Sequence, residues 1–130
     1  MTMRILGIDP GTTRIGYGVI EKGSALTLVT YGVIETTSPH TPERLLELGN
    51  GMRELIARIQ PAVAGVEQLF FSKNQKTALS VAQARGVIMH ELLFAGIPVT
   101  ECTPNQVKQT VTGYGNADKR AVSRMVAKLL

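Results

Sequence analysis

Two acidic residues stand in the same sequence context, each directly after a short apolar run. Asp9 follows residues 4–8, and Glu67 follows residues 62–66. If the two runs form neighbouring strands of one sheet, their carboxylates can converge on a hard cation such as Mg²⁺, which prefers oxygen ligands. Two such ions about 4 Å apart would stabilise the attacking and leaving oxygens of phosphodiester hydrolysis. The alternative is that each acid only ends a strand or opens a turn, as Asp-Pro-Gly often does.

Aromatic and basic residues that could bind nucleic acid follow the second acid. Phe70 and Phe71 precede a polar run that includes Lys73, and rings beside a basic loop can stack on bases or wedge between them. Residues 66–130 carry eight bases, Lys108 and Lys119 among them, against four acids, which accounts for the whole formal net charge of +4. This asymmetry favours a polyanionic partner, with nucleic acid first. Core rings and a solvated helix face are the alternatives.

The apolar pattern predicts the elements that would position these groups. Strands are predicted over 4–9, 15–21 and 25–34, which tight turns join into an antiparallel meander. A helix with Thr41 as its cap is predicted up to Pro61. The remaining predictions are a strand over 62–67, a helix over 77–95 that ends at Gly96, a strand over 97–101, a short helix near 105–110 and a helix from Asp118 onward. This order predicts an α/β fold with a mixed five-stranded sheet flanked by helices.

Small residues recur inside both long predicted helices. Gly49 and Gly51 each cost about 1 kcal/mol in a helix interior, so we expect them where the helix packs closely on the sheet. Ala78, Ala82 and Gly86 recur every four residues. That spacing lets another helix approach closely, either within the core or across a dimer.

Length and composition exclude several classes of protein. A chain of 130 residues allows one domain, and 44% hydrophobic with 18% charged residues is typical of a globular protein. The single cysteine excludes an internal disulfide framework and a cysteine-rich zinc site. No apolar run has the length of a membrane helix, and Asp9 interrupts the apolar continuity that a signal peptide needs. We therefore expect a cytoplasmic domain without membrane contact.

Five ordered segments resemble the RuvC family of bacterial Holliday-junction resolvases along nearly the whole chain. They are ILGIDPG (5–11) with GYG (16–18), VEQLF (66–70), QARG (83–86), QVKQT (106–110), and Lys119 with MV (125–126). The resemblance implies a single ribonuclease H-like domain over 1–130, acting as a homodimer. It implies an endodeoxyribonuclease that resolves four-way DNA junctions by paired nicks in recombination and repair, leaving 5′-phosphates and 3′-hydroxyls. Mg²⁺ is the implied cofactor, with Mn²⁺ as a substitute, and the RuvA–RuvB branch-migration complex is an implied partner.

The same resemblance assigns roles to individual residues. Asp9 and Glu67 match two metal-binding catalytic carboxylates of the family, and Phe70 matches the aromatic that enters the junction. Lys108 and Lys119 match its DNA-contacting lysines. The family completes its site with an Asp-x-x-Asp or Asp-x-x-His pair on a last helix, beyond a Leu-Leu pair like the one at 129–130. From the sequence we expect that helix to be missing and catalysis to be impaired.

Three other functions fit part of the sequence. Without the last acid pair, the chain would be a junction-binding module that does not catalyse cleavage. An actin-like ATPase or sugar kinase fits residues 7–13, which resemble the first phosphate loop of those proteins, but a second loop and an adenosine pocket are absent from the sequence. A related nuclease acting on RNA is disfavoured only through the resemblance at Phe70 and Lys108.

Overall fold

The computed structural model describes residues 2–68 and 75–102, which form a five-stranded sheet and two helices. The elements follow in the order β1 (Met3–Asp9), β2 (Arg14–Lys22), β3 (Leu26–Glu35), α1 (Thr41–Ile59), β4 (Val63–Glu67), α2 (Gln75–Phe94) and β5 (Val99–Cys102). The strand order is β3-β2-β1-β4-β5. Strands β1, β2 and β3 pair antiparallel, and β4 pairs parallel with both β1 and β5. The predicted meander, the two crossovers and the mixed sheet are confirmed.

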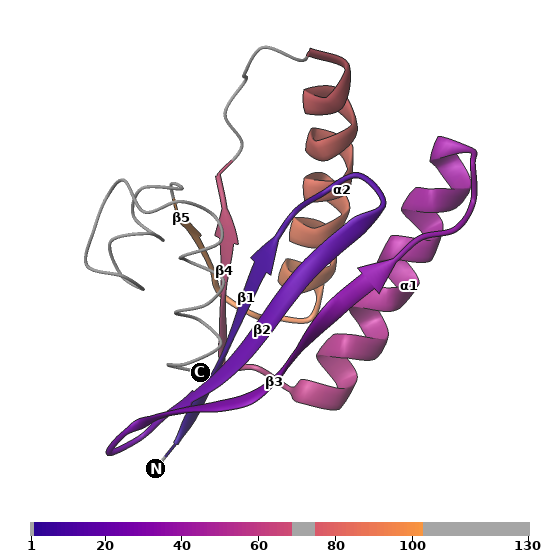
Figure 1. Cartoon of the computed structure of the whole chain (residues 1–130). Coiled ribbons are helices and arrows are strands. Elements are labelled where there is room, and N and C mark those ends of the chain that lie inside the picture. Colours follow the sequence, from indigo (N-terminus) through magenta and orange to yellow (C-terminus); the bar gives the residue numbers. More distant parts are fainter. Residues whose placement is uncertain (1, 69–74, 103–130) are drawn as a thin grey trace.

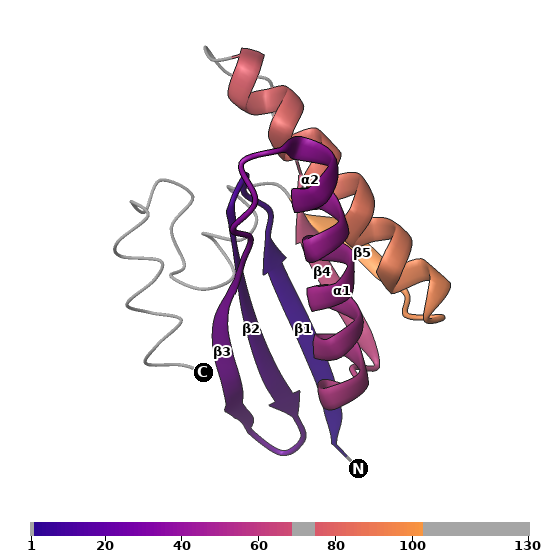
Figure 2. The same ribbon diagram turned by 90° about the vertical axis from the view of Figure 1, so that its right-hand side faces the viewer.

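Both helices cover the same face of the sheet (Figures 1 and 2). Alternate strand residues face them, so that Leu6 and Ile8 of β1 are buried while Gly7 and Asp9 are exposed. The buried residues that fill the space between sheet and helices are Leu6, Ile8, Ile15, Val19, Leu48, Met52, Leu55, Ile59, Ala64, Val66, Ala84, Ile88, Leu92 and Ile97. This one-sided burial sends every second residue of β1 and β4 to the face opposite the helices.

The start of α1 differs from the prediction. The N-cap is His40, whose side chain makes no capping hydrogen bond, and Thr41 is already helical. The preceding loop is held instead by Glu47, whose carboxylate accepts hydrogen bonds from the backbone N–H groups of Thr37 and Ser38, both at 2.9 Å. These donors lower the pKa of Glu47 below its ordinary value. The prediction of Thr41 as the cap is wrong because this tertiary contact replaces the local cap.

The two glycines inside α1 have different neighbours. A Cβ on Gly51 would lie 2.8 Å from Cγ2 of Ile34 on β3, which confirms close packing on the sheet. A Cβ on Gly49 would lie 3.6 Å from side-chain atoms of Val87 and Glu91, which belong to α2. The prediction of close packing on the sheet is therefore wrong for Gly49, since its neighbour is the second helix and the contact is of ordinary length.

Only one of the two described helices ends at a glycine, which is the usual residue at the C-terminal end of a helix. Gly96 after α2 has a φ of 78°, as expected for a helix stop. The residue after α1 is Gln60, which adopts the left-handed region at φ 50° and donates its backbone N–H to the carbonyl of Ile56 at 2.8 Å. No helix in the described part of the chain is long and apolar enough to cross a membrane.

Candidate functional site

Asp9 and Glu67 lie at the ends of two neighbouring parallel strands. The register pairs Ile5 with Val63 and continues to Ile8 with Val66, so each acid occupies the next position on its strand. Because the preceding residues Ile8 and Val66 are buried under the helices, both acids project from the opposite face. Adjacent strands lie about 4.8 Å apart, so two side chains in register on one face are direct neighbours. The predicted convergence of the two strand ends is present.

Glycines surround the acids on this face of the sheet. Gly16 of β2 pairs with Asp9, and Gly7 pairs with Gly18 in the adjacent pair on the same face. A Cβ at Gly18 would meet no described atom within 4 Å, and one at Gly7 or Gly16 would meet nothing closer than 3.9 Å. Among the described residues, the sheet beside the carboxylates therefore presents flat backbone, to which a ligand can approach closely.

The turn after Asp9 is tightly constrained. A Cβ at Gly11 would collide with the carbonyl oxygen of Arg14, a backbone atom that cannot rotate away. At the far end of the turn, the carbonyl of Thr13 accepts the backbone N–H of Thr36 at 2.9 Å and its hydroxyl at 3.3 Å. These contacts fix the chain directly after the first acid.

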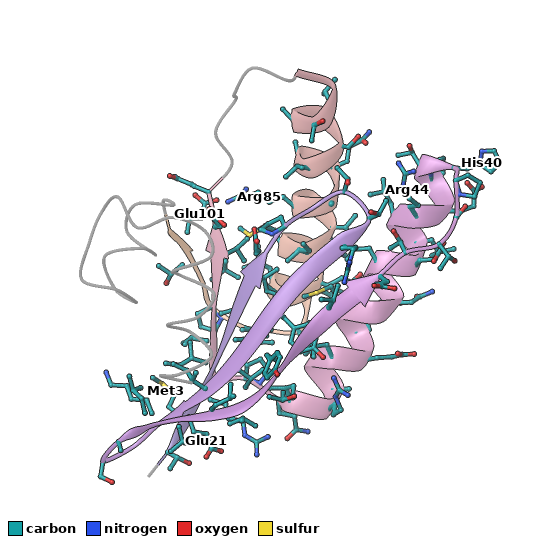
Figure 3. The ribbon with its side chains drawn as sticks, in the orientation of Figure 1. Met3, Glu21, His40, Arg44, Arg85 and Glu101 are labelled. Atoms are coloured by element: carbon teal, nitrogen blue, oxygen red, sulfur yellow. The ribbon has the colours of Figure 1, made fainter. Side chains whose placement is uncertain are left out.

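The end of β4 is held from the helix layer by Arg85 of α2. Its Nε donates to the carbonyl of Glu67 at 3.3 Å, and its Nη2 donates to the carboxylate of Glu101 on β5. Figure 3 shows Arg85 and Glu101 beside one another near the ends of β4 and β5. Arg85, first through its hydrogen bond and then through its charge, lowers the pKa of Glu101.

Sequence reasoning did not identify this contact. The sequence presents Arg85 only within the QARG segment, and Glu101 only as one of four acids. Their pairing depends on the register of β5 against β4, where Glu101 lies opposite Val66 on the helix-facing side. The signal that could have found it is the alternation along each strand, which puts Val66 and Glu101 on the same face of the sheet once the two strands are aligned.

The donor set fits a hard divalent cation. Among residues 2–68 and 75–102, no group of three or more His, Cys, Asp or Glu side chains is placed to hold a metal. Two carboxylates on neighbouring strand ends are nevertheless the kind of protein contribution that Mg²⁺ uses, since it retains waters and takes further oxygens from substrate phosphates. The remaining predicted site residues, Phe70, Phe71, Lys73, Lys108 and Lys119, lie outside the described residues.

The sheet order, the helix layer on one face and the acidic pair at the ends of β1 and β4 define a ribonuclease H-like domain with a carboxylate site. The family model of the crossover junction endodeoxyribonuclease RuvC matches residues 5–130, and the chain belongs to that family. The RuvC protein of Chloroflexus aggregans is 56% identical over 126 residues, which cover 95% of this chain and 77% of that protein. The RuvC protein of Moorella thermoacetica is 51% identical over 130 residues, covering 98% and 78%.

Solved structures agree with this assignment. The structure of Thermus thermophilus RuvC in complex with a Holliday junction substrate has a TM-score of 0.86 and 36% identity, covering 98% of this chain and 79% of that one. The yeast mitochondrial Holliday junction resolvase Ydc2 has a TM-score of 0.63 at 16% identity and shares the fold. The predicted family, the ribonuclease H-like fold and the assignment as a Holliday-junction resolvase are confirmed, and the family consists of nucleases that depend on divalent metals.

Proposed function

We propose that Asp9 and Glu67 are catalytic carboxylates that bind Mg²⁺, or Mn²⁺ in its place, and that together with the family's further acid pair they serve to nick four-way DNA junctions in pairs. The observation that supports this most is the parallel register of β1 and β4. It brings together the two acids that match the family's motifs, on the face away from the helices. The products expected are 5′-phosphates and 3′-hydroxyls.

The described residues contribute rigidity and access to this chemistry. When bound, Mg²⁺ supplies a Lewis acid for the phosphodiester oxygens and lowers the pKa of bound water. Asp9 and Glu67 present oxygen ligands from the ends of hydrogen-bonded strands, so their separation is set by the sheet. The flat backbone at Gly7, Gly16 and Gly18 leaves room for a DNA strand to approach the two carboxylates.

Charge-neutral substitutions of the two acids test this proposal. We expect Asp9→Asn and Glu67→Gln to weaken Mn²⁺ binding at least about tenfold and to abolish junction nicking, while junction binding in EDTA is unchanged. Glu54→Gln, which neutralises an exposed carboxylate on α1, is the matched control and should change none of the three. Undiminished Mn²⁺ binding in both variants would exclude the metal-ligand role. If the unsubstituted chain binds the junction but does not nick it in Mg²⁺ or Mn²⁺, the function that remains is that of a non-catalytic junction-binding module.

Five residues beyond the described part are proposed as DNA contacts on their sequence positions. Phe70 and Phe71 stand three and four residues after Glu67, and Lys73 follows them closely. Lys108 and Lys119 belong to the basic half of the chain. We assign the rings to contact with bases at the junction and the lysines to contact with phosphates.

The exposed face of α2 supports a homodimer. Leu79, Leu93 and Phe94 are 64%, 58% and 80% exposed, and a Cβ at Gly86 would meet no described atom within 4 Å. Ala78, which shares the four-residue spacing with Gly86, is buried in the core. The small-residue pattern therefore divides between the core and an open helix face. Exposed apolar side chains gathered on one helix are often covered in an assembly, and a second copy of α2 would cover these.

Partners and location follow from the substrate. The RuvA–RuvB branch-migration complex is proposed as a partner because it acts on the same kind of junction. The cytoplasm is the proposed location because a bacterial recombination substrate lies there. We also propose that residues 1–130 form a single domain.

A further inference from the structure

We propose that Arg85 is a positioning residue for Glu67: it fixes the end of β4, from which the Glu67 carboxylate projects, by binding the Glu67 carbonyl and the Glu101 carboxylate together. This inference rests on the proposed metal role of Glu67. Arg85 lies on the helix side of the sheet and Glu67 projects from the other side, so Arg85 acts through the backbone.

The end of β4 is where the sheet stops supporting the chain. The pairing between β1 and β4 ends at Ile8 with Val66, and the pairing between β4 and β5 ends at Glu67 with Cys102. Glu67 is the last residue paired with β5 and lies one position beyond the ladder with β1, and backbone groups that a ladder leaves unpaired need other partners. The Nε of Arg85 supplies one for the Glu67 carbonyl at 3.3 Å. This contact lies on the residue whose side chain must hold a fixed place for catalysis.

The second contact anchors the guanidinium itself. Glu101, on the neighbouring strand β5, accepts a hydrogen bond from Nη2 of Arg85. The guanidinium is thus held between the Glu67 carbonyl at the end of β4 and the Glu101 carboxylate on β5. The Arg85 side chain is 18% exposed, so water competes little for its donors. Its planar fork can serve two acceptors at once, which a lysine ammonium on a flexible stem does poorly.

Outer contacts of this kind orient the groups that bind a metal, and their loss typically weakens metal affinity about 10- to 100-fold. A merely structural arginine would change stability without changing metal affinity. Arg4 offers the comparison within the same sheet. It also donates to one carboxylate, that of Glu21, and to one backbone carbonyl, that of Ile59, both at 3.0 Å. Figure 3 shows Glu21 at the opposite end of the sheet from Glu101.

The experiment compares Arg85→Gln, Arg85→Lys and Arg4→Gln in the 130-residue chain. Mn²⁺ affinity is measured by electron paramagnetic resonance, and the thermal midpoint is measured without metal. We expect both glutamine variants to lower the midpoint, and only Arg85→Gln to weaken Mn²⁺ binding about tenfold or more. Arg85→Lys should recover part of the Mn²⁺ affinity, because one of the two contacts can be made.

The following results would overturn the proposal. The first is unchanged Mn²⁺ affinity in Arg85→Gln together with the same loss of stability as Arg4→Gln, which would make Arg85 structural only. The second is weaker junction binding of Arg85→Gln in EDTA with a shallower salt dependence, which would make it a phosphate contact. The third is full Mn²⁺ affinity in Glu67→Gln, which would remove the proposed metal role and this inference with it. Loss of affinity in Glu67→Gln but not in Arg85→Gln would overturn this inference alone.

Discussion

Glu91 on α2 is a buried carboxylate whose charge is paired with Arg53 of α1. Its side chain is 7% exposed, and the Nε of Arg53 on α1 donates to it at 2.9 Å. The hydrogen bond from Arg53 is the largest of the effects that lower the pKa of Glu91 below its ordinary value of 4.5. A carboxylate with a lowered folded-state pKa stabilises the fold above its unfolded pKa. That stability is lost as the pH falls through the folded-state pKa.

We therefore expect Glu91→Gln to lower the free energy of unfolding at pH 7 by about 1–2 kcal/mol, since the charged hydrogen bond is lost while exposed Arg53 is solvated. The difference from the unsubstituted chain should shrink as the pH falls from 4.5 through the lower folded-state pKa, because Glu91 is protonated first in the unfolded chain and then in the folded one. Urea unfolding at pH values of about 7, 5 and 3 measures it. Because Glu47 and Glu101 also have lowered pKa values, the variant should keep part of the acid sensitivity. A difference that stays constant down to the most acidic of these conditions would contradict the assignment.

The candidate site shows how much the local sequence around a single residue can reveal. Asp9 and Glu67 were predictable because each acid interrupts an apolar run, a pattern carried within six residues. Arg85 was not, because its contacts are with a carbonyl 18 residues away and a carboxylate 16 residues away. Composition and spacing indicate which side chains could react, whereas partners across elements depend on register.

Helix α1 offers a prediction at the scale of an element, because its two interior glycines meet different neighbours. Gly49→Ala should stabilise the fold by up to about 1 kcal/mol, since alanine has the higher helix propensity and the nearest atoms lie at 3.6 Å. Gly51→Ala should be less stable than Gly49→Ala by about 1–3 kcal/mol, because its Cβ meets the Ile34 methyl at 2.8 Å. Thermal unfolding of the two variants side by side is the measurement. Equal stabilisation by both alanines would show that α1 can move away from β3 without cost.

Elements were more predictable than their ends. The meander, α1, β4, α2 and β5 were all predicted from periodicity, since alternate or helical burial repeats over many residues. Their boundaries depended on single contacts. Glu47, inside α1, holds the loop before it and makes His40 the cap, and non-glycine Gln60 ends the helix in a left-handed conformation. The contact from Glu47 to Thr37 joins residues ten apart, and a single contact of this kind produces no repeating pattern in the sequence.

At the scale of the whole molecule, the two faces of the sheet have different roles. Among the described residues, one face packs on α1 and α2, and the other presents Asp9 and Glu67. The outer side of α2 faces away from both and is apolar at Leu79, Leu93 and Phe94. The proposed catalytic acids and the proposed dimer face thus lie on separate surfaces, so a substitution on α2 is expected to change the oligomeric state while leaving the carboxylate pair in place.

The dimer prediction uses this separation. Leu93→Glu places a charge on the exposed apolar face of α2, and its burial against a second copy would be costly. We expect the unsubstituted chain to elute as a dimer and Leu93→Glu as a monomer, measured by size-exclusion chromatography with light scattering. Leu46→Glu, on α1, is the matched control because that leucine is similarly exposed, at 66% against 58%, and the variant should still dimerise.

The same variants connect assembly to paired nicking. A four-way junction has two related strands to cut, so two active sites related by a two-fold axis can reach both in one complex. The Leu93→Glu monomer should bind Mn²⁺ as the unsubstituted chain does, because its carboxylates are unchanged, but bind the junction more weakly. A Leu93→Glu protein that stays dimeric would place the interface elsewhere. Aggregation of the unsubstituted chain that Leu93→Glu relieves, with no discrete dimer at any concentration, would show that this apolar face promotes non-specific association.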